Sequence, residues 1–232
     1  VLLLSLADSI SDSLGTLKIV TAPVSVIFTL LILCFIKKHN LWKKYGLCSF
    51  QGELKNYLYF IPLLLIISVN LWNGITMNSS IPETVLFILS MVCVGVIEEI
   101  IFRGFLFKAI CKDNIKSAVF ISSITFGVGH IVNLLNGKDL IPTLLQICYA
   151  AAIGFLFTII FYKGESLLPC IITHGGVNSL SIFAVDNSSL ICDVITAVIL
   201  CIVPIVYALW ILRGIKKLEK DENRETGNFN QY

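Results

Sequence analysis

The sequence predicts an all-α fold, a polytopic bundle of transmembrane helices. Hydrophobic residues make up 56% of the 232 residues and charged residues only 14%, with a mean hydropathy of +0.89. A soluble domain averages about 45–50% apolar and about 25% charged residues, so this composition excludes most soluble enzymes and disordered chains. The second observation is a series of apolar segments of the length that a bilayer requires. The net charge of +2 is too small to suggest a nucleic-acid partner.

We expect about seven membrane spans, because each needs roughly 17–25 mostly apolar residues and short polar loops separate the apolar segments. The predicted spans cover residues 19–36, 54–72, 83–107, 117–136, 140–162, 166–185 and 190–212. The apolar stub at residues 1–6 suggests the end of an earlier helix, which would make eight spans in a full-length chain. A cleaved signal peptide is the alternative interpretation of this stub.

The distribution of basic residues predicts an integral, multi-pass membrane protein with a cytoplasmic C-terminus. Lys and Arg concentrate in cytoplasmic loops. Fourteen of the 17 basic residues fall in segments 37–55, 108–116 and 213–232 or at Lys163, and only Lys138 falls in a loop on the opposite side. Lysine outnumbers arginine 14 to 3, which is typical of an AT-rich genome, and we therefore expect a bacterial cell membrane.

Six polar residues stand out deep inside the predicted spans, where ionisable groups are costly and usually functional. They are Glu98, Glu99, Arg103, His130, His174 and Asn178. At about 1.5 Å per residue, Glu98 lies about 15 Å, His130 about 21 Å and His174 about 12 Å from the cytoplasmic ends of their spans. Because helices that run in alternating directions bring these groups to similar depth, we expect one cavity in the cytoplasmic half of the bundle.

Spacing within the spans suggests partners for these side chains. Glu99 and Arg103 are four residues apart and share a helix face, so they can form an ion pair. Glu98 is rotated by about 100° from Glu99, which leaves its carboxylate free for other work. His174 and Asn178 also share a face. Small residues that allow close helix approach and leave room for a ligand flank both histidines: Gly127, Gly129, Gly175 and Gly176.

The chemistry of this set fits hydrolysis of an amide bond inside the membrane. A buried carboxylate can act as general base on a water, and His and Asn donors can stabilise an oxyanion. Two His and one Glu also form a known zinc set, so zinc at His130, His174 and Glu98 and a metal-free, glutamate-activated water both remain open. The sequence has neither the HExxH pattern of zinc proteases nor the GxSxG pattern of serine hydrolases.

Two other functions use similar residues. A proton- or ion-coupled transporter can employ a Glu/His cluster as a relay, although the sequence shows no internal repeat and no pair of broken helices. A non-catalytic bacteriocin immunity protein that binds a toxin is the other alternative. The intact set of Glu and His residues speaks against it, because binding alone does not need them.

Three motifs, Glu98-Glu99-x-x-x-Arg103, Phe126-x-x-x-His130 and His174-x-x-x-Asn178, together resemble the EExxxR, FxxxH and HxxxN/D motifs of a known family. This is the CAAX protease and bacteriocin-processing family (CPBP, or Abi) of intramembrane proteases. The resemblance implies that Glu98 activates the water, and that His130 orients this water or ligates a metal. It implies that His174 and Asn178 bind the metal or form the oxyanion site. Glu99 and Arg103 would hold the geometry.

The resemblance also implies an organisation and a substrate class. The N-terminal transmembrane helices occupy residues 1–80, the catalytic core 81–186, the C-terminal transmembrane helix 187–212, and a charged cytoplasmic tail, which we expect to be frayed, 213–232. Eukaryotic relatives cleave three residues from prenylated CAAX proteins, whereas bacterial relatives are linked to peptide processing, bacteriocin self-immunity or regulated membrane proteolysis. The implied partners are therefore the lipid bilayer and a membrane-associated peptide or protein, and we favour peptide or membrane-protein processing over prenyl-protein maturation. The family is often called a metalloprotease family, and a metal-free mechanism has also been argued for it.

Overall fold

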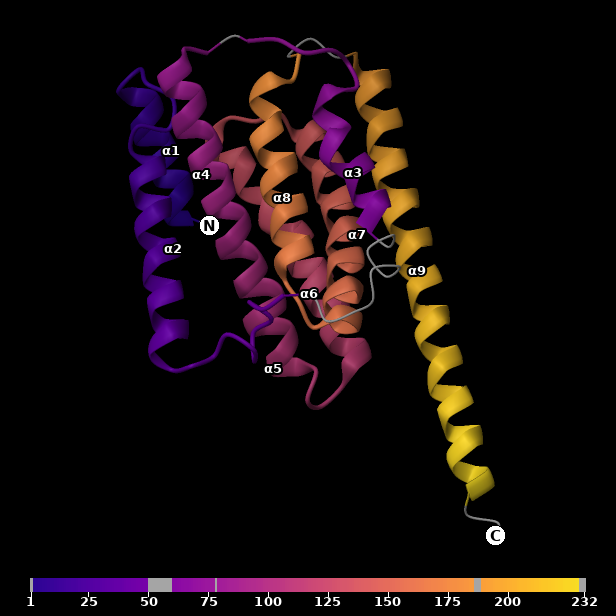
Figure 1. The fold of residues 1–232 in the computed structure, drawn as a ribbon. Coiled ribbons are helices and arrows are strands. Elements are labelled where there is room, and N and C mark those ends of the chain that lie inside the picture. The colour runs from indigo at the N-terminus through magenta and orange to yellow at the C-terminus, as the bar shows by residue number, and fades with distance from the viewer. Residues whose placement is uncertain (1, 50–59, 78, 186–188, 230–232) are drawn as a thin grey trace.

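The computed structural model describes residues 2–49, 60–77, 79–185 and 189–229, with the side chains of the last helix described as far as Arg213. These residues form helices joined by short loops and contain no strand (Figure 1), which confirms the predicted all-α polytopic fold. The α-helices are α1 Leu2–Ser13, α2 Thr21–Lys38, α3 Ile61–Ile67, α4 Ile81–Glu99, α5 Lys108–Ile110, α6 Ile115–Gly129, α7 Leu140–Gly164, α8 Leu168–Leu180 and α9 Leu190–Phe229. The 3-10 helices are η2 Ser68–Leu71, η4 His130–Asn136 and η5 Ser181–Phe183, and η3 Ile100–Phe107 is a π-helix.

Five helical stretches in the described part of the chain are long and apolar enough to cross a membrane. They are Thr21–Lys38, Ile81–Ile110, Ile115–Asn136, Leu140–Gly164 and Leu190–Arg213. The other two predicted spans correspond to shorter apolar helices, Ile61–Leu71 and Leu168–Phe183. Residues 54–59 of the predicted span 54–72 lie outside the described residues. The stub at the start of the chain belongs to α1.

The charged tail differs from the expectation. We expected residues 213–232 to be frayed, but α9 continues without interruption to Phe229. The physical reason lies in the residue types, because Lys, Glu and Arg are strong helix formers and the tail has no proline. Hydrophilic composition alone therefore did not predict the helical backbone of this segment.

Two of the three helices that carry the motifs, α4 and α6, begin at side-chain caps. A capping box starts α4, in which Ser80 Oγ accepts from the Glu83 amide and Glu83 Oε2 accepts from the Ser80 amide. At the start of α6, the side chain of Asn114 accepts from the Ser117 amide at 3.0 Å. These caps satisfy amides that have no partner inside the helix, and they set where α4 and α6 begin.

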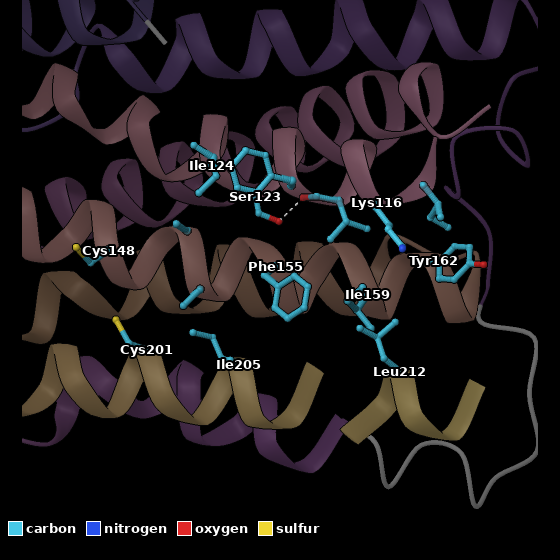
Figure 2. Close-up of a pocket in the computed structure, with 15 residues that line it drawn as sticks. Lys116, Ser123, Ile124, Cys148, Phe155, Ile159, Tyr162, Cys201, Ile205 and Leu212 are labelled. Atoms are coloured by element: carbon cyan, nitrogen blue, oxygen red, sulfur yellow. Dashed lines mark hydrogen bonds between the residues drawn. The ribbon is translucent and has the colours of Figure 1, made fainter. Parts of the chain in front are cut away.

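Helix α7 is the central span of the bundle. More than half of its most apolar window is buried, against a third or less for the other long spans. It packs extensively against α6 and α9, while α4 packs against α8 and α2 (Figure 1). A groove runs along α7 between α6 and α9 (Figure 2). The packing of these helices brings together the three segments that carry the motifs, which are α4 with η3, α6 with η4, and α8.

Two of the motif helices change their hydrogen-bonding period at the motif itself. Helix α4 passes into the π-helix η3 directly after Glu99, and α6 passes into the 3-10 helix η4 at His130. Such changes inside a helix often mark functional sites. Ser122 Oγ of α6 donates to the carbonyl of Phe102 in the π segment at 2.9 Å. The sequence predicted uninterrupted helices here, and this contact from another helix is not visible in local periodicity.

Candidate active site

Glu99 and Arg103 form an ion pair that is completely buried. Arg103 Nη1 donates to Glu99 Oε1 at 2.9 Å, and neither side chain has any exposed surface. Arg103 Nη2 donates to the carbonyl of Gly154 on α7 at 3.2 Å. The guanidinium also lies over the ring of Phe126, 4.2 Å from its centroid. The predicted ion pair is confirmed, and it additionally ties η3 to both α6 and α7.

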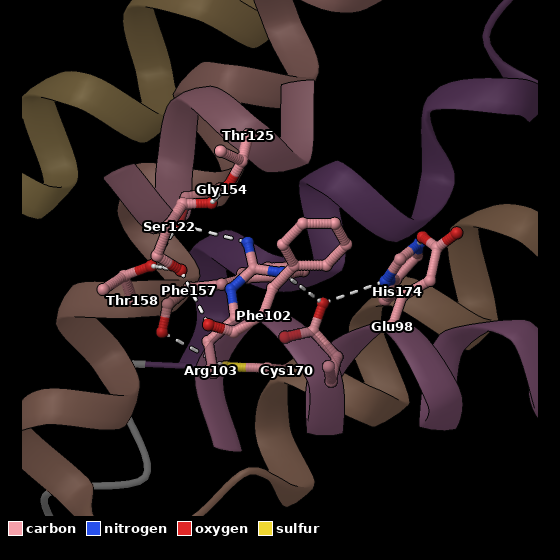
Figure 3. A network of polar contacts seen from close by, with 11 residues as sticks. Glu98, Phe102, Arg103, Ser122, Thr125, Gly154, Phe157, Thr158, Cys170 and His174 are labelled. Atoms are coloured by element: carbon pink, nitrogen blue, oxygen red, sulfur yellow. Dashed lines mark hydrogen bonds and ion pairs between the residues drawn. The ribbon is translucent and has the colours of Figure 1, made fainter. Parts of the chain in front are cut away.

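His174 lies between the two carboxylates of α4 (Figure 3). Its Nδ1 is 2.9 Å from Glu99 Oε1, and its Nε2 is 3.6 Å from Glu98 Oε2. Because a carboxylate accepts, we assign the ring proton to Nδ1, where it is donated to Glu99. The opposite ring nitrogen then faces Glu98. A separation of 3.6 Å is too long for a direct hydrogen bond, so the two groups face each other without one.

The two carboxylates differ in their access to water. The Glu99 side chain is fully buried, whereas the Glu98 side chain keeps 15% of its surface exposed. Glu99 is also paired with Arg103, while the Glu98 carboxylate has no Lys or Arg partner among the described residues and faces only His174. The two adjacent glutamates therefore occupy distinct environments: Glu99 is anchored by Arg103, whereas Glu98 is accessible to water.

The ring of Phe126 is the common contact of both histidines. It meets His130 edge to face with ring centroids 5.6 Å apart and an interplanar angle of 84°. It meets His174 in the same way at 5.4 Å and 89°. Arg103 covers this ring as well. The FxxxH motif contained Phe126, but the sequence analysis assigned it no role, and only the structure shows that it links three polar members of the site.

Asn178 follows His174 by one turn of α8 and is partly exposed. Its side chain makes no hydrogen bond to another described residue, and the same holds for the partly exposed His130 ring. A residue that the sequence analysis missed lies nearby, because Asn70 Nδ2 donates to the carbonyl of Val177 at 2.6 Å. Asn70 falls inside the predicted span 54–72, so the rule that identified the other polar residues also applied to it.

Close helix contacts bring these groups together. A Cβ atom added to Gly95 of α4 would lie 2.9 Å from the backbone nitrogen of Gly175 in α8. One added to Gly127 of α6 would lie 2.7 Å from the Cβ of Ala151 in α7. The expected close approach is thus confirmed beside both histidines, whereas Gly129 has open space around it, with Phe102 4.0 Å away. Gly95 and Gly175 form this close α4–α8 contact together, but only Gly175 is next to a histidine in the sequence.

The predicted zinc ligands do not converge as a metal-binding group. Within the described residues, no three His, Cys, Asp or Glu side chains are placed to hold one ion. Both ring nitrogens of His174 face carboxylates of α4. The donor set therefore does not fit zinc in this arrangement, and the choice between zinc and a metal-free water is not tested by it.

The fold and this cluster together define an integral membrane protein with a buried carboxylate–histidine site. Residues 80–180 match the family model described as Type II CAAX prenyl endopeptidase Rce1-like. This segment contains all three motifs, so the match confirms the resemblance to the CAAX protease family stated from the motifs. No curated protein and no solved structure gives a significant match to the chain.

Proposed function

We propose that the protein is an intramembrane endopeptidase that hydrolyses a peptide bond of a membrane-associated peptide or protein. The observation that carries this proposal is the position of His174 between the anchored Glu99 and the accessible Glu98. The family match at residues 80–180 supports a protease of the CAAX type.

Glu98 is the general base in this proposal. A water that donates one O–H to Glu98 Oε2, beside His174 Nε2, keeps its lone pair for the substrate carbonyl carbon. As the new C–O bond forms, Glu98 takes a proton from the water. When the C–N bond breaks, Glu98 returns this proton to the departing amine. Glu99, compensated by Arg103, holds the imidazole in one orientation throughout.

His130 and Asn178 are the proposed donors to the oxyanion. Neither side chain is hydrogen-bonded to another described residue, so the N–H groups of both are available to a substrate. His130 is positioned by the ring of Phe126, and Asn178 by the helix that carries His174. Donors that are already oriented stabilise a tetrahedral intermediate, and the loss of one typically lowers the rate about 10²–10³-fold.

We expect Glu98→Gln to lower peptide cleavage by about 10²–10⁴-fold, the usual contribution of a general base. The measurement uses the full chain in liposomes with two anchored peptides of equal length, one ending in a prenylated CAAX sequence and one of the leader type. Thermal unfolding checks that the variant stays folded. Glu165→Gln, an exposed carboxylate at the end of α7, is the matched control and retains full activity.

Histidine variants complete this experiment. His130→Ala and His174→Ala lose cleavage, while His39→Ala, the exposed third histidine beyond the end of α2, does not. Unchanged cleavage in Glu98→Gln would overturn the mechanism. Ion flux without cleavage of either peptide would instead assign the cluster to a transporter.

The proposed activation of water needs no metal, because Glu98 and His174 together suffice to hold and deprotonate it. We therefore expect cleavage to survive a strong chelator and the purified protein to contain zinc well below one equivalent. Loss of activity on chelation with recovery on zinc addition would contradict this prediction. It would then assign His130, His174 and Glu98 as ligands.

A further inference from the structure

The groove between α6, α7 and α9 is separate from the candidate active site. Its volume is about 830 Å³, within the range of about 300–1,000 Å³ typical of small-molecule sites. None of the six predicted site residues lines it. Helix α7 forms the floor, and α6 and α9 form the walls (Figure 2). The apolar lining includes Val119, Ile124, Phe155, Ile159, Ile205 and Leu212.

The groove is shorter than the hydrocarbon core of a bilayer. Its lining runs from Ile115 to Ile124 on α6, about 14 Å, from Cys148 to Tyr162 on α7, about 21 Å, and from Cys201 to Leu212 on α9, about 16 Å, at 1.5 Å per residue. All three lengths are below the roughly 30 Å of the hydrocarbon core. A partner transmembrane helix would contact the bundle through the whole core. A groove of this shorter length instead fits a hydrocarbon chain that enters from one membrane surface.

One end of the groove carries a positive charge. Lys116 and Tyr162 line it there, at the start of α6 and near the end of α7. The Lys116 side chain is exposed and forms no ion pair with another described residue. Arg213 directly follows the groove residue Leu212 and is also exposed. An amphiphile with a hydrocarbon chain and an anionic headgroup would match both the apolar lining and the positively charged end of the groove.

We propose that this groove is a binding site for an anionic phospholipid. One acyl chain lies on α7 between α6 and α9, and the phosphate pairs with Lys116. The lipid belongs to the leaflet on whose side Lys116 lies. This site uses no residue of the proposed catalytic machinery, so it stands or fails independently of the protease proposal.

Native mass spectrometry of the full chain tests the headgroup. Phosphatidylglycerol and phosphatidylcholine with identical acyl chains are compared at equal concentration. We expect selective retention of phosphatidylglycerol, with a selectivity that drops about fivefold in Lys116→Gln, as for one basic residue at an anionic surface. Lys112→Gln, at an exposed lysine that precedes α6 and does not line the groove, leaves the selectivity unchanged. Equal retention of both lipids, or no effect of Lys116→Gln, overturns the proposal.

A second pair of variants tests whether the groove binds an acyl chain of the lipid. Cys201→Phe fills the deep end of the groove and should abolish lipid retention, whereas Ile202→Phe, at an exposed neighbour outside the lining, should not. Lipid bound equally by both variants overturns the proposed position. Displacement of the lipid by a prenylated peptide would assign the groove to substrate, and a dimer joined through α9 without lipid would assign it to a second copy, so either result also overturns the proposal.

Discussion

A single oxygen atom, Glu99 Oε1, joins Arg103 of η3 to His174 of α8, with both partners at 2.9 Å. Because all three side chains are buried, this junction replaces the water that would otherwise solvate their charges. It also sets which ring nitrogen of His174 faces Glu98. The same atom therefore contributes to stability and, in the proposed mechanism, to the orientation of the catalytic histidine.

Arg103→Met, compared with a double variant, separates the contribution to stability from the contribution to the orientation of His174. It leaves the buried carboxylate of Glu99 without its cation, and we expect the free energy of unfolding to fall by about 3–5 kcal/mol. The double variant Glu99→Gln/Arg103→Met removes both charges and should recover about half of this loss. Peptide cleavage should be lost in the double variant, because His174 no longer has a carboxylate anchor. Unfolding in mixed micelles and the cleavage assay measure the two effects, and a double variant no more stable than Arg103→Met would contradict the expectation.

At the scale of elements, the site depends on how closely α4 approaches α8. Gly95 and Gly175 meet backbone to backbone, three and four residues from Glu98 and Glu99 on one helix and next to His174 on the other. Small residues at membrane helix interfaces permit such approach. A shift between these two helices changes the distance from Glu98 to His174 directly.

Gly95→Ala tests this dependence, with Gly175→Ala as the matched control variant. Its added Cβ would lie 2.9 Å from the Gly175 nitrogen, so α4 must move away from α8. We expect about a 100-fold loss of cleavage, the effect of displacing reacting groups by about 1 Å. Gly175→Ala adds a Cβ at an ordinary 3.5 Å from Val92 Cα, and activity should stay within a few-fold of wild type. Equal activity of the two variants would show that the helix contact does not set the site.

At the scale of the whole molecule, basic residues gather at one end of the bundle. The C-terminal end of α2, the short helix α5 and the charged end of α9 all lie at the end drawn lowest in Figure 1. The loops that join α1 to α2 and η4 to α7 lie at the opposite end. We propose that the basic end faces the cytoplasm, because positively charged loops are retained there.

Reporter fusions measure this orientation. A reporter that is fluorescent only in the cytoplasm should be fluorescent when it follows Tyr232 and dark when inserted at Gly137, whose surroundings are open. Retained peptide cleavage shows that each fusion is correctly folded. The reverse pattern of fluorescence would invert the proposed orientation.

The sequence by itself determined the membrane environment, five of the spans and the Glu99–Arg103 pair, because these depend on apolar segment length and on spacing within one helix. It also identified the motifs that mark the family. Only the tertiary structure decided that His174 bridges Glu98 and Glu99, that Phe126 contacts both histidines, and that α4 and α6 change period at their motifs. Local periodicity states which residues share a face of one helix. The rotation and depth of that helix against its neighbours follow from contacts such as Gly95–Gly175, between residues far apart in the chain.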